Sequence, residues 1–317
     1  MPDSVYTWTY DAEDGTYKNH ALANKLKEHS ALKFVVAQFA NPVNDFGKQK
    51  GETYNWFHYS PLDIPSNPYL NEDEEMPLDT LEMGTASVTL REIGRGVQVT
   101  SLSKELSAYD PETAAQKKLT EQMKTVMEVL AATALKTAKV CAIPTSATAI
   151  TFDTDGTPST AAANNLTLAH CGLIRDYLVN TLHTPFYEGD HYVGLFTTKA
   201  LRGLKGDSAM IAWAQYLKEG DLVYRSEVFK VENIRFVEVN MEAALSNAIG
   251  TNSCTGQGII FGDDALDIIE AVSPYLAYET KDFGRFKRAA WRGVLAFGLP
   301  WQTANDREAK VVRWTSS

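Results

Sequence analysis

A histidine followed directly by a cysteine comes nearest to nucleophilic chemistry in this sequence. His170 precedes Cys171, and an imidazole can activate a thiol when the two side chains are in contact. The pair lies in a segment with helical spacing, where neighbouring side chains point about 100° apart and do not face each other. The other cysteines, Cys141 and Cys254, are distant in the sequence and form no CxxC pair. We therefore expect small buried thiols, and no thiol catalysis, redox centre or zinc site.

Two pairs of carboxylates could serve metal binding or acid–base chemistry. Asp153 and Asp155 resemble the beginning of a calcium-binding loop, but the glycine that follows is out of register and the closing glutamate is missing. Asp263 and Asp264 precede residues 265–269, which we expect to form a helical turn. Carboxylates in that position cap a helix by accepting hydrogen bonds from its free amides. The sequence therefore predicts structural roles for both pairs.

The motifs of common enzyme classes are absent from the sequence. It contains no GxSxG, no GxxxxGK[ST], no GxGxxG and, among its six histidines, no HExxH. Gly94-x-Gly96 and Gly256-x-Gly258 lack a third glycine, and we expect turns or bulges there. A long chain of varied elements without such a constellation is typical of an assembly subunit. We predict no catalytic residue, no cofactor and no metal site.

The charge and hydropathy of the chain limit the classes of partner that it can bind. The 317 residues carry a formal net charge of −10, whereas proteins that grip nucleic acid by its phosphates usually present a basic surface. The N-terminus shows no basic segment followed by an apolar run, and no window of about 18 apolar residues exists. We expect no secretory signal, no membrane partner and synthesis in a reducing cytoplasm. DNA could lie beside such a protein without being bound specifically.

The strongest helix signal begins at Asp110. Asp110 is a favourable N-cap, Pro111 occupies the preferred first position, and Glu112 adds negative charge where the helix dipole favours it. The helix is expected to continue to about Lys139, before Pro144, and to span about 40 Å as a spine. Its apolar face has a spacing of three and four residues and contains Leu119, Met123, Val126, Met127, Leu130 and Ala134.

The remainder of the chain after this spine alternates between helices and strands. Helices are expected at 166–182, at 199–204 with Thr198 as N-cap, and at 209–217. Strands are expected at 191–196, 227–239, 258–262, 275–281 and 291–299. The small, polar stretches 145–165 and 240–257 are expected to be loops, and the first is a candidate domain boundary.

A long segment rich in proline, aromatic residues and acids precedes the spine. Residues 41–83 contain five prolines, and structureless loops of this length are uncommon unless they are functional or disordered. Its aromatic cluster argues against disorder. Strand alternation returns between residues 84 and 100. We expect a long excursion that becomes ordered against another molecule, preceded at 1–31 by an N-terminal arm with a short basic helix around Leu22.

Four segments together carry a family resemblance. They are 90–100 (LREIGRGVQVT) followed by the spine, 191–196 (HYVGLF) with 201–204 (LRGL), 229–238 (FKVENIRFVE) and 259–266 (IIFGDDAL). In this order they resemble the Hong Kong 97-type major capsid proteins of tailed bacteriophages, and more narrowly the podovirus-type family. The resemblance implies an α+β fold in five parts. These are an N-terminal arm at 1–44, an extended loop and return strand at 45–100, a peripheral domain with the spine helix at 101–145, an axial domain at 146–275, and returning strands of the peripheral domain at 276–317.

The resemblance also implies a structural function without catalysis. The chain would assemble with itself, as hexamers and pentamers, into an icosahedral shell that encloses double-stranded phage DNA. Scaffolding and portal proteins, and in some shells a cement protein, would be further partners, with assembly in the host cytoplasm and residence in the virion. The residues we expect at contacts between subunits are the loop aromatics Tyr54, Trp56, Phe57 and Tyr59, the acids Glu72, Asp73, Glu74 and Glu75, and the bases Arg285, Lys287 and Arg288.

Two alternative interpretations remain open on the sequence. An encapsulin-like compartment shell would share the fold and would enclose enzyme cargo in place of DNA. A cytoplasmic hydrolase with a site dispersed along the chain belongs to a different class of protein, and would be a monomer with a cleft.

Overall fold

The structure is a computed structural model of the whole chain. It describes residues 34–43, 51–59, 62, 64–70, 72–73, 75–106, 110–208, 210, 227–246, 256–301 and 309–315, and these belong to one compact unit. The expected arm helix, Cys254, Glu74 and nearly all of the helix expected at 209–217 lie outside the described residues.

The spine helix predicted from its capping residues is confirmed as α2 (Pro111–Leu135). The Asp110 side chain accepts hydrogen bonds from the Glu112 amide at 3.2 Å and the Thr113 hydroxyl at 2.6 Å. Its 25 residues correspond to roughly 38 Å. The helix ends earlier than expected because the chain turns at Lys136 and then enters a buried strand.

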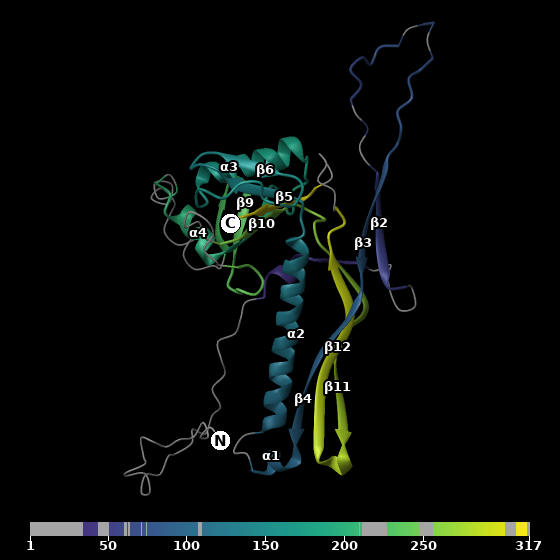
Figure 1. The fold of residues 1–317 in the computed structure, drawn as a ribbon, viewed down its shortest axis with the longest axis vertical. Helices are drawn as coiled ribbons and strands as arrows, with labels where there is room; N and C mark the ends of the chain where they lie inside the picture. Colours follow the sequence, from purple (N-terminus) through teal and green to yellow (C-terminus); the bar gives the residue numbers. More distant parts are fainter. Residues whose placement is uncertain are drawn as a thin grey trace. The chain divides into compact units, whose positions relative to one another are not determined.

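The strands of the described residues form three sheets, one of them a simple hairpin (Figure 1). The four-stranded sheet has the order β1 (Asn41–Val43), β11 (Asp267–Lys281), β12 (Phe286–Gly298) and β4 (Arg91–Thr100). The seven-stranded sheet has the order β6 (Ile150–Asp153), β5 (Val140–Pro144), β13 (Val311–Trp314), β10 (Gly258–Phe261), β7 (Tyr192–Thr197), β9 (Ile234–Val239) and β8 (Glu227–Val231). The hairpin pairs β2 (Thr53–Tyr59) with β3 (Met83–Thr89).

Short helices complete the described fold. They are η2 (Val36–Phe39), α1 (Ser101–Leu106), α3 (Leu168–Asp176) continued by the π-helical turn η3 (Tyr177–Thr181), α4 (Thr198–Lys205) and the turn η5 (Asp282–Gly284). The helix predicted at 166–182 is thus confirmed, and so is the one at 199–204. The N-cap of α4 is Thr197, one residue before the expected Thr198, and its hydroxyl accepts from the Ala200 amide.

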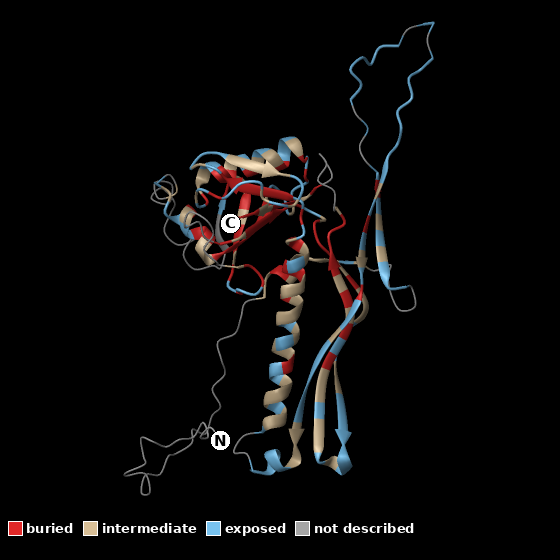
Figure 2. Cartoon of the chain, viewed as in Figure 1, coloured by how far each residue is buried: buried red, intermediate tan, exposed pale blue. Residues whose placement is uncertain are grey.

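Alternate residues of the seven-stranded sheet bury into two separate cores. On one face, residues such as Val193, Leu195 and Val239 pack with Leu135 of α2 and Leu295 of β12. On the other face, large side chains pack under α3 and α4, among them Tyr192, Phe196, Phe236 and Trp314. Figure 2 shows the buried residues gathered in this sheet and where α2 and β12 reach it. The sheet is therefore the central layer of the fold.

A buried carboxylate fixes the segment that precedes β1. Glu128 of α2 is fully buried and accepts hydrogen bonds from three consecutive amides, those of Val35 and Val36 at 2.7 Å and of Ala37 at 3.0 Å. A carboxylate removed from water is stable only when hydrogen bonds replace its hydration. These bonds hold η2 against α2, and β1 then pairs in parallel with β11.

The strand order corrects two expectations. Residues 265–269 do not form a helical turn capped by Asp263 and Asp264, because β11 begins at Asp267 and pairs with β12 from there. The β-branched Ile268 and Ile269 favour that extended conformation. β13 does not extend the sheet of β11 and β12, as 276–317 was expected to do, but lies between β5 and β10.

The glycines of β4 are not the expected bend or bulge. β4 pairs with β12 without a register shift from Arg91 to Thr100. Gly94 allows β4 to lie close to β12, because a Cβ there would be 2.6 Å from the carbonyl oxygen of Trp291. The loop expected at 145–165 also contains a strand, β6, which pairs with β5.

Replacing Glu128 by alanine tests the anchor of η2. The change leaves three amides, one of them fully buried, without their acceptor, and we expect the free energy of unfolding to fall by about 3 kcal/mol. Urea denaturation of the purified protein, followed by circular dichroism, measures the effect. The matched control is Lys124→Ala, an exposed position one turn earlier on α2, which should change stability by no more than about 0.5 kcal/mol. Equal losses in the two variants would contradict the anchor.

Candidate interaction surface

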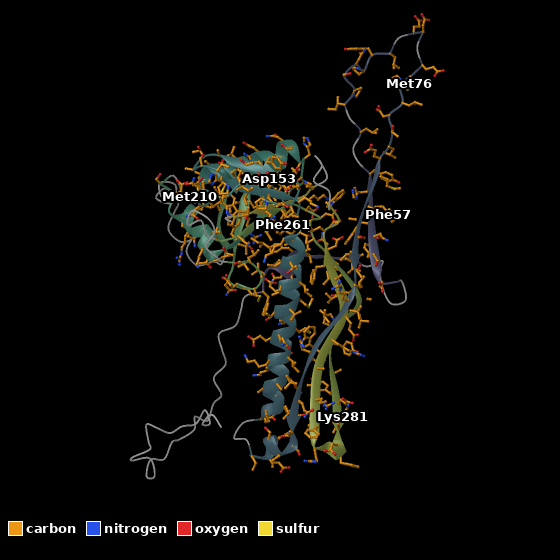
Figure 3. The ribbon with its side chains drawn as sticks, in the orientation of Figure 1. Phe57, Met76, Asp153, Met210, Phe261 and Lys281 are labelled. Carbon is orange, nitrogen blue, oxygen red and sulfur yellow. The ribbon has the colours of Figure 1, made fainter. Side chains whose placement is uncertain are left out.

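The segment between β2 and β3 exposes an unusual amount of apolar surface. Every described residue from 62 to 82 is exposed, and the Leu78 side chain is 91% accessible. Figure 3 labels Met76 on this loop and Phe57 at its base. The exposed apolar side chains are Phe57, Tyr59, Leu62, Ile64, Tyr69, Leu70, Met76, Leu78, Leu81 and Met83. A folded monomer rarely leaves so many together, and such surfaces mark sites of interaction.

The pleat of the hairpin divides the four predicted contact aromatics into two pairs. Tyr54 and Trp56 pair with Val88 and Ala86, and both are partly buried. Phe57 and Tyr59 alternate with them on the other face and are 68% and 64% accessible. Phe57 and Tyr59 thus remain available to another molecule, whereas Trp56 packs on its own chain.

Trp56 anchors the hairpin to the four-stranded sheet. Its indole Nε1 donates a hydrogen bond to Oδ2 of the buried Asp267, at 2.7 Å. Asp267 is the Cα partner of Gly298, and a Cβ at Gly298 would lie only 2.5 Å from the Trp56 ring. The absence of a side chain at position 298 therefore makes room for the indole. No local sequence signal identifies this contact, because Trp56 and Asp267 are 211 residues apart.

A second aromatic contact lies farther along the same strand. The rings of His58 and Trp301 are 5.2 Å apart, and a Cβ at Gly84 would collide with the His58 ring. Trp301 Nε1 in turn donates to Asp264, and the Lys310 ammonium lies 4.1 Å from the Trp301 ring centroid. Asp264 also forms an ion pair with Lys310 at 3.0 Å. The carboxylate expected to cap a helix instead binds the segment beside the hairpin.

The acidic run and the basic residues are not joined within the chain. The described acids Glu72, Asp73 and Glu75 are exposed, and no ion pair joins them to any described residue. The predicted contact bases have partners of their own: Arg285 pairs with Asp282 at 3.1 Å, Lys287 with Glu112 at 3.2 Å, and Arg288 with Glu279 at 3.8 Å. Hydrogen bonds from Lys104 and Lys287 lower the pKa of Glu112. These bases are thus already partly neutralised in the subunit.

The buried titratable groups are occupied by structural bonds. The His170 ring contacts the Thr167 amide and the Ser146 carbonyl, and Cys171 donates to the Thr167 carbonyl at 3.4 Å, so the two side chains do not form a pair. Burial lowers the pKa of His170 and raises the pKa of Cys171. Asp153 accepts from Ser159, and Asp155 accepts from the Thr157 amide.

The described residues contain no group of three or more His, Cys, Asp or Glu side chains placed to bind a metal ion. Among the same residues, no helix is long and apolar enough to cross a membrane.

The fold as a whole is that of known phage capsid chains. A chain of the cyanophage Pam1 capsid superposes with a TM-score of 0.69 at 16% identity, covering 100% of this chain and 99% of its own length. A chain of the acidic stable capsid of Helicobacter pylori bacteriophage KHP30 gives 0.69 at 12% identity, covering 95% and 96%. A chain of the Ralstonia phage GP4 capsid gives 0.63 at 14%, covering 94% of each. This chain shares their fold.

The likeness extends over nearly the whole length in each case, so it includes the hairpin loop and both larger sheets. It confirms the predicted α+β capsid architecture. No protein-family model and no curated protein matches the sequence.

Replacing Trp56 by alanine tests the anchor of the hairpin. Loss of the indole removes its hydrogen bond and its packing, so amide protons of β2 and β3 should exchange at least about tenfold faster, while those of β11 and β12 stay protected. Hydrogen exchange followed by mass spectrometry measures both. Phe57→Ala is the matched control, since its side chain lies on the exposed face of the same strand. Unchanged exchange in the Trp56 variant would show that the hairpin is held by other contacts.

Proposed function

We propose that this chain is the major capsid protein of a tailed bacteriophage, a structural subunit without catalytic activity. The observation that carries the proposal is an end-to-end likeness of fold to capsid chains, together with a loop whose apolar side chains have no cover in their own subunit. Copies of the chain would form an icosahedral shell around packaged DNA, assembled in the host cytoplasm with scaffolding and portal proteins. The net charge of −10 suits a shell that encloses DNA without binding it tightly.

The sheets suggest a revised division of the subunit within this proposal. The peripheral domain would comprise β1, β4, α1, α2, β11 and β12, and the axial domain would comprise the seven-stranded sheet with α3 and α4. The extended loop would comprise β2, β3 and the residues between them. β5 and β13, which the sequence assigned to the peripheral domain, would then belong to the axial domain.

Electron microscopy of the purified protein and of virions tests the function directly. Closed shells, filled with DNA in virions, are the expected result. Shells enclosing enzyme cargo would indicate an encapsulin-like compartment, and monomers alone would contradict a shell protein.

Shortening the loop separates folding from assembly. Tyr59 and Met83 are Cα partners at the end of the hairpin, so residues 60–82 can be replaced by an Asn-Gly turn. We expect stability within about 1 kcal/mol of the wild type, because the described loop residues are exposed, and we expect no shells. Thermal melting and electron microscopy give the two readouts. A variant that unfolds would place the loop in the core, and a variant that assembles normally would remove it from the interface.

The acidic run can be tested by reversing its charge. With Glu72, Asp73, Glu74 and Glu75 all changed to Lys, we expect soluble subunits that do not form shells. Exposed pairs contribute about 0–1 kcal/mol each, so the effect must come from the cluster and should weaken in high salt. Light scattering across a salt series measures it, with Asp176→Lys on α3 as an exposed control. Normal shells from the fourfold variant would contradict pairing between this run and the basic residues of a neighbour.

A further inference from the structure

The turn that joins β11 to β12 holds an aromatic ring in solvent. Asp282, Phe283 and Gly284 have φ values of 51°, 50° and 92°, three left-handed residues in succession. Residues other than glycine rarely adopt this conformation, and where it persists it is typical of functional sites. As a result the Phe283 side chain is 107% accessible.

Hydrogen bonds fix this turn and connect it to α1. The Arg285 amide donates to the Asp282 carbonyl at 2.9 Å, and the Ser101 amide donates to the Arg285 carbonyl at 2.9 Å. α1 therefore begins beside the turn (Figure 1), and it adds two exposed leucines, Leu102 and Leu106, one helical turn apart. We call Leu102, Leu106 and Phe283 the tip patch. The backbone that carries the Phe283 ring is held by these hydrogen bonds, so less backbone entropy is lost on binding.

A trough lies in the same hairpin, on the face of the sheet turned away from α2. Trp291 bonds Gln122 and Lys287 pairs with Glu112, so odd-numbered residues of β12 face α2 and even-numbered residues face the other way. On that other face Gly96, Ala290 and Ala277 form one row across three strands, with no side chain larger than a methyl group.

Larger side chains border this row on both sides, in the next rows along the strands. On one side Arg288 bonds Gln98 at 2.8 Å and pairs with Glu279. On the other side Arg292 bonds the Tyr275 hydroxyl and lies over its ring, 5.2 Å from the centroid. The trough is open to solvent and has a volume of about 430 Å³.

We propose that Phe283 of one subunit seats in this trough of a second copy of the chain. The inference rests on the proposed shell function and names one of its contacts. Seven residues separate Phe283 from Ala290, about 23 Å along a strand, so the hairpin cannot fold its own tip into its own trough. Anchor and receptor on one chain make a surface complementary to another copy of itself.

Shape and charge both fit this occupant. An aromatic ring in a pocket of small residues is typical of the few side chains that dominate an interface. Asp282 and Arg285 flank the ring, and Glu279 and Arg288 border the trough. Each carboxylate is paired with its guanidinium within its own chain, so neither pair adds a net charge that would oppose the approach.

Truncating the anchor and filling the trough should have the same effect on assembly. Phe283→Ala and Ala290→Leu are each expected to raise the subunit concentration needed for shells roughly tenfold or more, with circular dichroism and melting unchanged. Val179→Ala, an exposed apolar position on η3, is the control. Shell formation by both variants at the wild-type concentration would overturn the contact, whatever the loop does.

Cross-linking identifies the occupant of the trough. Subunits carrying Phe283→Cys and subunits carrying Ala290→Cys are mixed, assembled and treated with a short bismaleimide. Cys141 and Cys171 are buried, and the wild type sets the background. We expect covalent dimers in the mixture and none above background in either single variant.

Each other result overturns the proposal. Dimers from Phe283→Cys alone would mean that the tips of two copies contact each other. If Leu78→Cys mixed with Ala290→Cys gives dimers and Phe283→Cys mixed with Ala290→Cys does not, the loop fills the trough. Intact shells without covalent dimers would contradict this contact but not the proposed capsid function. Wild-type subunits that never associate would overturn the capsid function, and this contact with it.

Discussion

Three consecutive amides bound to one buried carboxylate set the arrangement on which the rest of the subunit depends. Glu128 lies where α2 reaches the core shared with the seven-stranded sheet and β12, and its bonds to Val35, Val36 and Ala37 close that core from the N-terminal side. A fully buried carboxylate would be costly without these donors. The segment that it fixes continues as β1 along β11. One buried side chain therefore fixes to the spine helix a segment that packs in the shared core and continues into the four-stranded sheet.

Away from that junction the fold cannot cover its own apolar surface. α2 covers one face of β4 and β12, and the opposite face carries the trough. The hairpin loop and the tip patch are likewise exposed. The buried core around Glu128 therefore has to stabilise the fold on its own. The loop, the trough and the tip patch add stability only if another molecule covers them. Hydrogen bonds hold the backbone at both surfaces, through Trp56 and Asp267 at the hairpin and within the turn around Phe283, so less backbone entropy is lost when a partner binds.

Local signals predicted several of the elements, among them α2, but they could not predict which elements pair. Asp110 and Pro111 define the start of α2 because capping is decided within a few residues. The partner of Trp56 is 211 residues away, and nothing near either residue indicates the other. The same limit explains β13, whose four residues gave no reason to prefer the seven-stranded sheet. The prediction of a helical turn at residues 265–269 was wrong. Two aspartates suggested a helix cap, while the β-branched isoleucines after them favoured a strand.

The predicted contact residues stay a prediction, and the structure adds which of their side chains are exposed. An aromatic cluster in a proline-rich loop indicated an interface, but the pleat that turns Trp56 inward and Phe57 outward appears only once β2 and β3 are paired in register. The sequence around Phe283 did not indicate that this side chain is exposed. Its exposure follows from a left-handed backbone that an Asp-Phe-Gly sequence does not dictate.

If the chain assembles as proposed, the need to stay soluble beforehand would explain why acids and apolar residues alternate on the loop. Met76, Leu78 and Leu81 would by themselves favour indiscriminate association, particularly while the chain is newly made. Glu72, Asp73 and Glu75 precede them, and Asp79 and Glu82 lie among them. Like charges repel when two free loops approach each other, whereas a neighbour's surface that presents guanidinium groups does not repel them. The same carboxylates can therefore oppose loop-to-loop aggregation and permit the loop to bind a neighbouring subunit, so specificity comes from the repulsion as much as from the attraction.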